Sequence, residues 1–202
     1  MSYLKHFVLQ HQNYEKLFDY SLRNNMVVYQ RVDGLNRNAD EPVLSECCRL
    51  LLLRLVRMVI DFFDSNLCFD AFTFNDIMID LAYDNVPRLV TGLTTNTATP
   101  GGIDRNLSSL VDVIEKGVLS RSSGLPHDLT ELFKLMRNNG HKNIDIINVH
   151  SSLIPLENVR ELFLRMHSEY FDLKKSSPTD YITVSQGFIF PADWELKIQS
   201  NK

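Results

Sequence analysis

Three aspartates come closest, by type and spacing, to a group of residues that could do chemistry. Asp76, Asp80 and Asp84 are four residues apart, in a segment at 75–86 that the spacing of its apolar residues predicts to be helical. Residues four apart lie on one face of a helix, so the three carboxylates would form an acidic stripe. Mg²⁺ prefers carboxylate oxygens as ligands, and the stripe is therefore a candidate metal site for a Mg²⁺-dependent enzyme.

The acidic stripe also has a structural explanation, which we favour. Like charges at this spacing repel each other, so the stripe would be stabilised by solvent or by basic residues of a neighbouring helix. Helical enzymes that act on diphosphates through Mg²⁺ usually need a second acidic cluster, and the sequence shows none. We expect Arg49, Arg54 and Arg57 to pair with the stripe instead.

The same arginines suggest a second alternative function. Arg49, Arg54 and Arg57, with Arg31 and Arg37 nearby, form the most basic local group of the chain. Exposed arginines neutralise the phosphates of nucleic acid, and neighbouring tyrosines could stack on its bases. Arginines on a mostly buried helix cannot reach a nucleic acid, so nucleic-acid binding remains the alternative rather than the leading hypothesis.

The cysteines do not indicate a metal site or a disulfide framework. The chain has three of them, and Cys47 and Cys48 are adjacent, whereas Cys68 follows at no zinc-binding spacing. Thiols in an apolar helix have a raised pKa and react poorly. We therefore expect no cofactor and a reducing compartment.

The C-terminal residues form the candidate partner-binding site. The last fifteen residues hold an apolar group, Phe188, Ile189, Phe190 and Trp194, close to the end of the sequence. Such a segment either docks into the protein's own core or supplies aromatic anchors to another subunit. The two possibilities stay open at this stage.

A long apolar helix at 44–63 must position most of the chain. Its charged residues occupy an arc of roughly 140° at about 100° per residue, and most of the remaining circumference is apolar. Twenty residues span about 30 Å, which is also the thickness of a bilayer core. Arg54, Arg57 and Asp61 would each cost a few kcal/mol in lipid, so we predict a buried core helix and no membrane span.

Around this helix we expect amphipathic helices and a few short strands. A further helix is predicted from Pro155 to about Lys174, with Met166 and Tyr170 among its inward residues, and strands are predicted near 26–32, 144–149 and 181–190. The predicted fold is mainly α, a helical bundle around the central helix, with a mixed α+β fold as the alternative. We expect one domain over 1–202, with an exposed, flexible loop at about 91–102, where Thr, Asn, Pro and Gly occur without charge.

Composition and charge narrow the function by exclusion. With 44% hydrophobic and 23% charged residues the chain is of ordinary globular type. The net charge is −4, and no run of basic residues marks a nucleic-acid footprint. The N-terminal residues lack a continuous apolar segment, so we expect no signal peptide and a location in the cytoplasm or nucleus.

The leading hypothesis is a non-enzymatic, intracellular protein that binds other proteins, itself included, as an adaptor or as a structural subunit. A high asparagine content suggests an AT-rich genome, and a viral origin fits it. Nucleic-acid binding through the arginines and Mg²⁺-dependent catalysis through the aspartates are the two alternatives.

Overall fold

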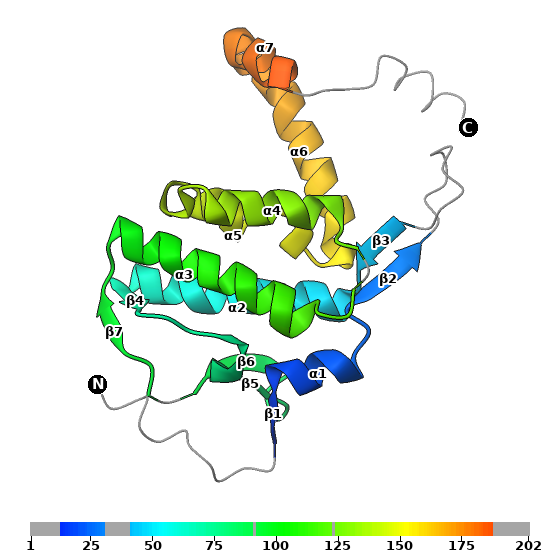
Figure 1. Cartoon of the computed structure of the whole chain (residues 1–202). Helices are drawn as coiled ribbons and strands as arrows, with labels where there is room; N and C mark the ends of the chain where they lie inside the picture. The colour runs from blue at the N-terminus through cyan, green and yellow to red at the C-terminus, as the bar shows by residue number, and fades with distance from the viewer. Residues whose placement is uncertain (1–12, 31–40, 91, 123, 188–202) are drawn as a thin grey trace. The chain divides into compact units, whose positions relative to one another are not determined.

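The structure is a computed structural model, and it describes residues 13–30, 41–90, 92–122 and 124–187 (Figure 1). Contacts within the chain divide it into two compact units, Met1–Leu156 and Glu157–Lys202. Over the described residues the fold is mixed α+β, with seven α-helices and seven short strands that pair antiparallel. No helix in these ranges is both long and apolar enough to cross a bilayer.

The apolar helix predicted at 44–63 is present as α2 (Glu46–Asp64). Its first turn is capped by Ser45, whose side-chain oxygen accepts a hydrogen bond from the Cys48 backbone N–H at 3.2 Å. Six of its apolar residues have at most 2% of their surface exposed: Leu51, Leu52, Leu55, Val56, Val59 and Cys48. The burial follows from the sequence pattern, because apolar residues cover most of the helix circumference.

Several elements of the first unit contact α2. The helix α3 (Pro100–Val113) lies beside it and continues into a π-helical turn, η2 (Ile114–Val118) (Figure 1). The helix α4 (His127–Arg137) packs on α3, and α1 (Leu17–Arg23) contacts η2. The short α5 (Ile144–Asn148), the 3₁₀ turn η4 (Ser151–Leu153) and two strands also reach α2, whereas the 3₁₀ turn η3 (Gly140–Lys142) contacts α3.

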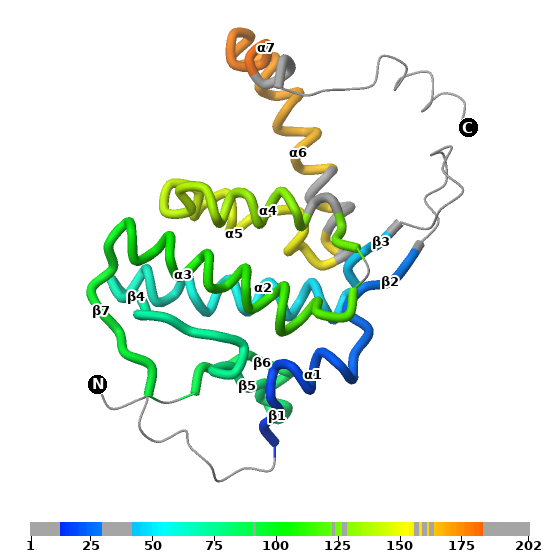
Figure 2. Tube along the Cα trace, in the orientation of Figure 1, coloured from blue at the N-terminus to red at the C-terminus, as the bar shows by residue number. Residues whose placement is uncertain are grey.

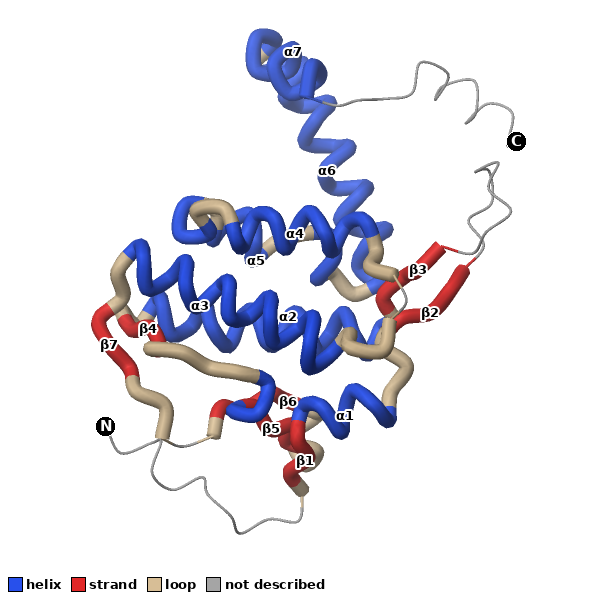
Figure 3. The backbone as a smooth tube through the Cα atoms, in the orientation of Figure 1, coloured by secondary structure: helices blue, strands red, loops and turns tan. Residues whose placement is uncertain are grey.

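The strands form three small antiparallel sheets, shown in red in Figure 3. One has the order β1 (Tyr14–Lys16), β5 (Ile77–Asp80) and β6 (Val86–Leu89). The others pair β2 (Val27–Gln30) with β3 (Glu41–Leu44), and β4 (Leu67–Phe69) with β7 (Thr95–Thr97). The strand predicted at 26–32 is therefore confirmed over 27–30, and residues 31 and 32 lie outside the described ranges.

A buried asparagine joins β4 to α3. Asn106 is fully buried, and its side-chain oxygen accepts from the Phe69 N–H while its amide nitrogen donates to the Phe69 carbonyl, each at 2.7 Å. The Asn106 side chain thus makes the two hydrogen bonds that a neighbouring strand would make to Phe69. Without them, the N–H and the carbonyl of Phe69 would be buried without partners, which is costly.

The second unit contains the helix α7 (Pro178–Gly187) and all but the first residue of the helix α6 (Leu156–Ser176), and the two helices follow each other along the chain (Figure 2). Ser177 lies between them, and its hydroxyl donates to the Asp180 carboxylate at 2.6 Å. Proline at the first position of α7 fits a helix start, because the N–H that proline lacks would have no partner there.

Two predicted strands are wrong in the described residues. In the segment 144–149, residues 144–148 form α5 and Val149 lies in the turn after it; the burial has helical spacing, because Ile147 is buried and Ile144 half-buried, while Ile146 between them is 54% exposed. The segment 181–187 belongs to α7, since the start at Ser177 and Pro178 commits the chain to a helix. Residues 188–190 lie outside the described ranges.

The helix predicted at 75–86 is also wrong. A capping box between Thr73 and Asp76 starts only a 3₁₀ turn, η1 (Phe74–Asp76), after which the chain is extended as β5. Ile77 and Ile79 are two residues apart in β5, so they point to the same face of the strand, and both are buried. The backbone groups of β5 form hydrogen bonds with β1 and β6. The reversal between β5 and β6 places Asp84 and Asn85 in the left-handed region, at φ 56° and 59°, which aspartate and asparagine tolerate better than most residues.

The loop predicted at 91–102 contains regular structure. Thr95–Thr97 form β7, and Thr99 caps α3 by accepting a hydrogen bond from the Gly102 N–H at 3.1 Å. The uncharged Thr and Asn residues of β7 pair with β4, and proline and glycine form the first turn of α3. The residue types that suggested a loop therefore occur in a strand and in the start of a helix. Most of the described part is exposed, as predicted.

Candidate functional site

The three aspartates of the predicted metal site have separate structural roles. Asp76 accepts hydrogen bonds from the backbone N–H and the hydroxyl of Thr73, at 2.7 and 2.9 Å. Asp84 lies in the turn after β5, where its carbonyl and carboxylate accept from the guanidinium of Arg54. Within the described ranges no group of three His, Cys, Asp or Glu side chains is placed to hold a metal ion.

Asp80 is the buried member of the three, with 1% of its surface exposed. It accepts from the Tyr14 hydroxyl and from the Ala82 N–H, both at 3.2 Å, and the Arg88 guanidinium is 3.8 Å away. Burial raises the pKa of the Tyr14 phenol, and the neighbouring Asp80 carboxylate raises it further. These contacts join β1, β5 and β6, which is a structural role for the carboxylate.

The arginines of the nucleic-acid alternative do not share one exposed face. Arg49 is 7% exposed and donates to the carbonyls of Ser151 and Ser152 at 3.3 and 3.4 Å. Arg54 binds Asp84, as the pairing hypothesis predicts for one of the three arginines, and Arg57 is exposed. Arg31 and Arg37 lie outside the described ranges.

The cysteines lie in apolar surroundings. Burial raises the pKa of the Cys48 thiol to about 12, so at neutral pH this thiol is protonated and a poor nucleophile. Cys68 is buried as well, and Cys47 lies 3.4 Å from the hydroxyl of Tyr20. Burial raises the pKa of the Tyr20 phenol, and the contact with Cys47 raises it further.

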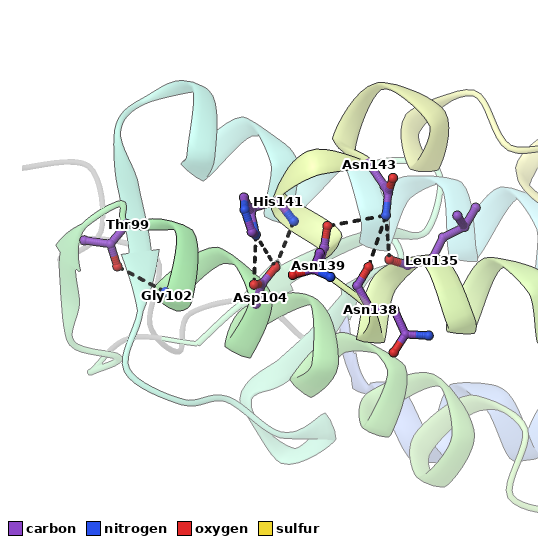
Figure 4. A network of polar contacts seen from close by, with 8 residues as sticks. All are labelled: Thr99, Gly102, Asp104, Leu135, Asn138, Asn139, His141 and Asn143. Atoms are coloured by element: carbon purple, nitrogen blue, oxygen red, sulfur yellow. Dashed lines mark hydrogen bonds and ion pairs between the residues drawn. The ribbon is translucent and has the colours of Figure 1, made fainter.

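A polar network that the sequence did not reveal joins α3 to η3 (Figure 4). The Asp104 carboxylate accepts from the His141 backbone N–H at 2.8 Å and lies 2.8 Å from His141 Nδ1. The two hydrogen bonds from His141 lower the pKa of Asp104, against an opposing effect of desolvation. Beside them, the Asn143 amide donates to the carbonyls of Leu135, Asn138 and Asn139 at the end of α4.

In hydrolytic enzymes a carboxylate that binds histidine Nδ1 orients the imidazole ring for catalysis. The Asp104–His141 pair therefore has two candidate roles, one in catalysis and one in holding the fold. An ionised carboxylate can only accept, and Nδ1 therefore carries the proton in this contact. The Asp104 carboxylate also accepts a hydrogen bond from the backbone N–H of His141, which a catalytic role would not need. We assign the pair to holding η3 against α3.

A small cavity lies between the end of α1, the start of β2 and the turn after η2. Its volume is about 210 Å³, and its polar lining includes Ser21, Asn24, Asn25 and Arg121. Ligand sites are usually larger, at about 300–1,000 Å³. The Ser21 hydroxyl donates to the Gly117 carbonyl at 2.7 Å, which gives that carbonyl a partner in the π-helical turn. The small volume of the cavity and this hydrogen bond support a structural role for its walls, which join α1 to η2.

The remaining candidate is the surface of the second unit. Four large apolar side chains on α6 and α7 are exposed by 46–56%: Leu164, Met166, Phe171 and Ile182. None of the side chains described between 158 and 183 is buried. The prediction that Met166 points inward is therefore wrong, because α6 presents apolar residues on more than one face and has no core of its own among the described residues.

Aromatic contacts join α6 to α7. The Tyr170 and Tyr181 rings have centroids 4.7 Å apart, and the Lys174 ammonium lies 5.5 Å from the Tyr181 ring centroid. On α6 itself, the rings of His167 and Phe171 are 4.6 Å apart. These contacts fix the two helices of the unit to each other and leave Leu164 and Phe171 exposed.

The predicted partner-binding residues Phe188, Ile189, Phe190 and Trp194 lie outside the described residues, so their role stays a prediction. The chain matches no protein-family model, and no curated protein matches it in sequence.

Proposed function

We propose that this chain is a non-enzymatic protein that works by binding other proteins, as an adaptor or as a subunit of an assembly. The observation that carries the proposal is the exposed apolar surface of α6 and α7, where Leu164, Met166, Phe171 and Ile182 face solvent in a unit without a buried side chain in its described part. Leu164 and Phe171 lie seven residues apart on one face of α6, and apolar side chains that lie together on a surface mark contact sites.

The energetics of isolated helices support this proposal. A helix in water is only marginally stable by itself, and in proteins most of its stability comes from packing of an apolar face. The helix α6 has 21 residues, and among those with a described side chain Leu164, Met166 and Phe171 are apolar and exposed. A protein partner that covers these side chains would stabilise the helix and gain affinity from the same burial.

The contacts of the predicted polar sites favour structural roles for them. Asp76, Asp80 and Asp84 bind Thr73, Tyr14 and Arg54 respectively, and they lie on different elements. Arg49 binds backbone carbonyls from a buried position. Neither catalysis by the aspartates nor nucleic-acid binding by the arginines is needed to explain these contacts.

Several finer features belong to the same proposal. The helices of the first unit form a bundle centred on α2, and Phe188, Ile189, Phe190 and Trp194 add apolar anchors to the partner surface. The protein acts inside the cell, in the cytoplasm or nucleus, and binds itself or other proteins. A viral origin fits the composition.

Size-exclusion chromatography with light scattering and absorbance at 260 and 280 nm tests the proposal. Purified protein should form complexes, with itself or with an added partner, whose absorbance ratio is that of protein alone. A raised 260/280 nm ratio that salt lowers would overturn the proposal in favour of nucleic-acid binding. A rise in the unfolding temperature with Mg²⁺, lost in Asp80→Asn, would favour the metal-dependent enzyme.

A further inference from the structure

We propose that the outer edge of β2 binds an extended segment of a partner protein, which adds a strand beside β2 and places an acidic side chain next to Arg121. This site lies in the first unit and does not involve the exposed side chains of α6, so it goes beyond the proposed function. Strand addition is a common way for a sheet edge to bind a peptide, because backbone hydrogen bonds supply affinity and side-chain pockets supply specificity.

The register of β2 and β3 shows which backbone groups of β2 point away from β3. Val27 lies opposite Leu44. Next to this pair, the N–H of Ser45 donates to the carbonyl of Met26 at 3.0 Å. Hydrogen-bonded and non-hydrogen-bonded residue pairs alternate in an antiparallel ladder, so Val27 belongs to a non-hydrogen-bonded pair. Its N–H and carbonyl therefore point outward, and no described residue binds them.

Most other strand edges in the described residues are closed to a further strand. The same alternation turns Pro42 of β3 and Pro87 of β6 outward, and proline has no N–H to donate. The outer edge of β4 is bound by the Asn106 side chain. The strand β1 carries the charged Glu15 and Lys16, and charged residues on an edge strand disfavour pairing.

The strands β2 and β7 have neither a proline nor a charged residue. The strand β7 has three residues, which are threonine and asparagine. The strand β2 has four residues, among them Val27, Val28 and Tyr29. Valine and tyrosine are enriched in strands, whereas asparagine is depleted. Of these two strands, β2 therefore fits an added strand better.

The cavity at the end of α1 lies beside β2. Val27, Tyr29 and Arg121 line it, and no described residue of β3 does. Val27 and Tyr29 are two residues apart, so their side chains share one face of the strand. A residue of the added strand that pairs with Val27 points its side chain to the same face. The cavity volume of about 210 Å³ equals that of about seven water molecules in the liquid, which leaves room for a carboxylate side chain.

The charges around the cavity favour an acidic side chain. Arg121 is exposed and forms no ion pair with a described residue, and no aspartate or glutamate lines the cavity. Ser120, Ser122 and Asn25 add hydroxyl and amide donors to the lining. A carboxylate bound here would accept charge-assisted hydrogen bonds from the guanidinium, whereas a basic side chain would be repelled by Arg121.

Selection from a phage-displayed library of random peptides against the full-length protein tests the inference. We expect the enriched peptides to carry an aspartate or glutamate within a run of strand-forming residues. Arg121→Glu should raise their Kd by about tenfold or more, because the guanidinium is replaced by a like charge. Arg57→Glu is the matched control, since it makes the same charge change at an exposed arginine of α2 and should leave the Kd unchanged.

Methylation of the peptide backbone separates strand addition from binding by side chains alone. A single N-methyl group removes one hydrogen-bond donor of the peptide and leaves the protein unchanged. Alternate residues of a strand point their N–H groups to the neighbouring strand. The affinity should therefore fall at every second position of an enriched peptide and stay near that of the parent peptide at the positions between.

Three results would overturn the inference: no enriched peptide, equal affinity of the wild type and Arg121→Glu for the enriched peptides, or an N-methyl series without a period of two residues. Peptides that bind only after removal of residues 188–202 would assign the edge to the chain's own C-terminal segment, which would also overturn it.

Discussion

The ring of Tyr170 on α6 lies against the ring of Tyr181 on α7, with centroids 4.7 Å apart and planes inclined at 39°. Through this contact α7 is held to α6 within a unit that has no buried side chain in its described part. The pair thus joins α7 to α6, and Leu164 and Phe171 stay exposed beside it.

Replacement of Tyr181 should release α7 from α6. Aromatic pairs contribute about 0.5–1.5 kcal/mol beyond their buried area, and Tyr181→Ala also removes the Lys174 contact. We expect faster amide hydrogen exchange across α7 and unchanged exchange in α2. Ile182→Ala is the control, because Ile182 is exposed and its loss should not alter exchange; equal effects of the two variants would contradict the role of the ring pair.

Replacement of Asn106 should destabilise the first unit strongly. Asn106→Ala leaves the N–H and carbonyl of Phe69 without their buried partners, and each unsatisfied group costs about 1–3 kcal/mol. Urea unfolding should therefore show a loss of about 2–6 kcal/mol. The exposed Asn96→Ala serves as the control, with an expected change within about 0.5 kcal/mol.

A methyl group at Gly117 should be poorly tolerated. A Cβ there would lie 2.5 Å from the Phe74 Cβ and 3.1 Å from its Cγ, and overpacking of this kind costs about 1–3 kcal/mol. Gly101→Ala is the matched control, since a Cβ at Gly101 meets nothing within 4 Å and alanine favours the helix there. Thermal unfolding should give a lower midpoint for Gly117→Ala only; equal midpoints would show that Phe74 moves aside.

The Asp104–His141 contact should make stability depend on pH in the acid range. The pKa of Asp104 is lowered in the folded state, so its contribution is fully present above the unfolded pKa of about 4 and is lost as pH falls through the lower folded value. The difference in unfolding free energy between wild type and Asp104→Asn should be about 1–2 kcal/mol at pH 7 and shrink below about pH 4. Asp145→Asn is the exposed control; a difference that grows towards low pH would contradict the assignment.

Part of the fold could be predicted from local pattern alone. The helix α2 was predictable because nineteen residues hold an apolar pattern longer than any strand, with Ser45 as its cap. The strands β5 and β6 were not, because β5 pairs with β1, where Ile79 lies opposite Glu15 far back in the sequence, and with β6 across the turn. A helical periodicity over a short segment cannot outweigh such tertiary pairing.

The polar contacts were harder to predict than the helices, and for the same physical reason. Asp104 and His141 are 37 residues apart, and only the packing of η3 on α3 brings them together. The candidate partner surface was missed because an amphipathic pattern shows which residues of α6 are apolar but not whether the chain itself covers them. Met166 was predicted to point inward on that ground and is 52% exposed.

The central claim is that the exposed side chains of Leu164 and Phe171 on α6 serve association and not the folding of this chain. The most direct test is the light-scattering mass of Leu164→Ser/Phe171→Ser beside that of the wild type at equal concentration, with the unfolding midpoint measured in dilute solution. We predict a lower mass for the double variant and an unfolding midpoint close to that of the wild type. An unchanged mass together with a lowered midpoint would contradict the claim, because the two side chains would then stabilise the fold.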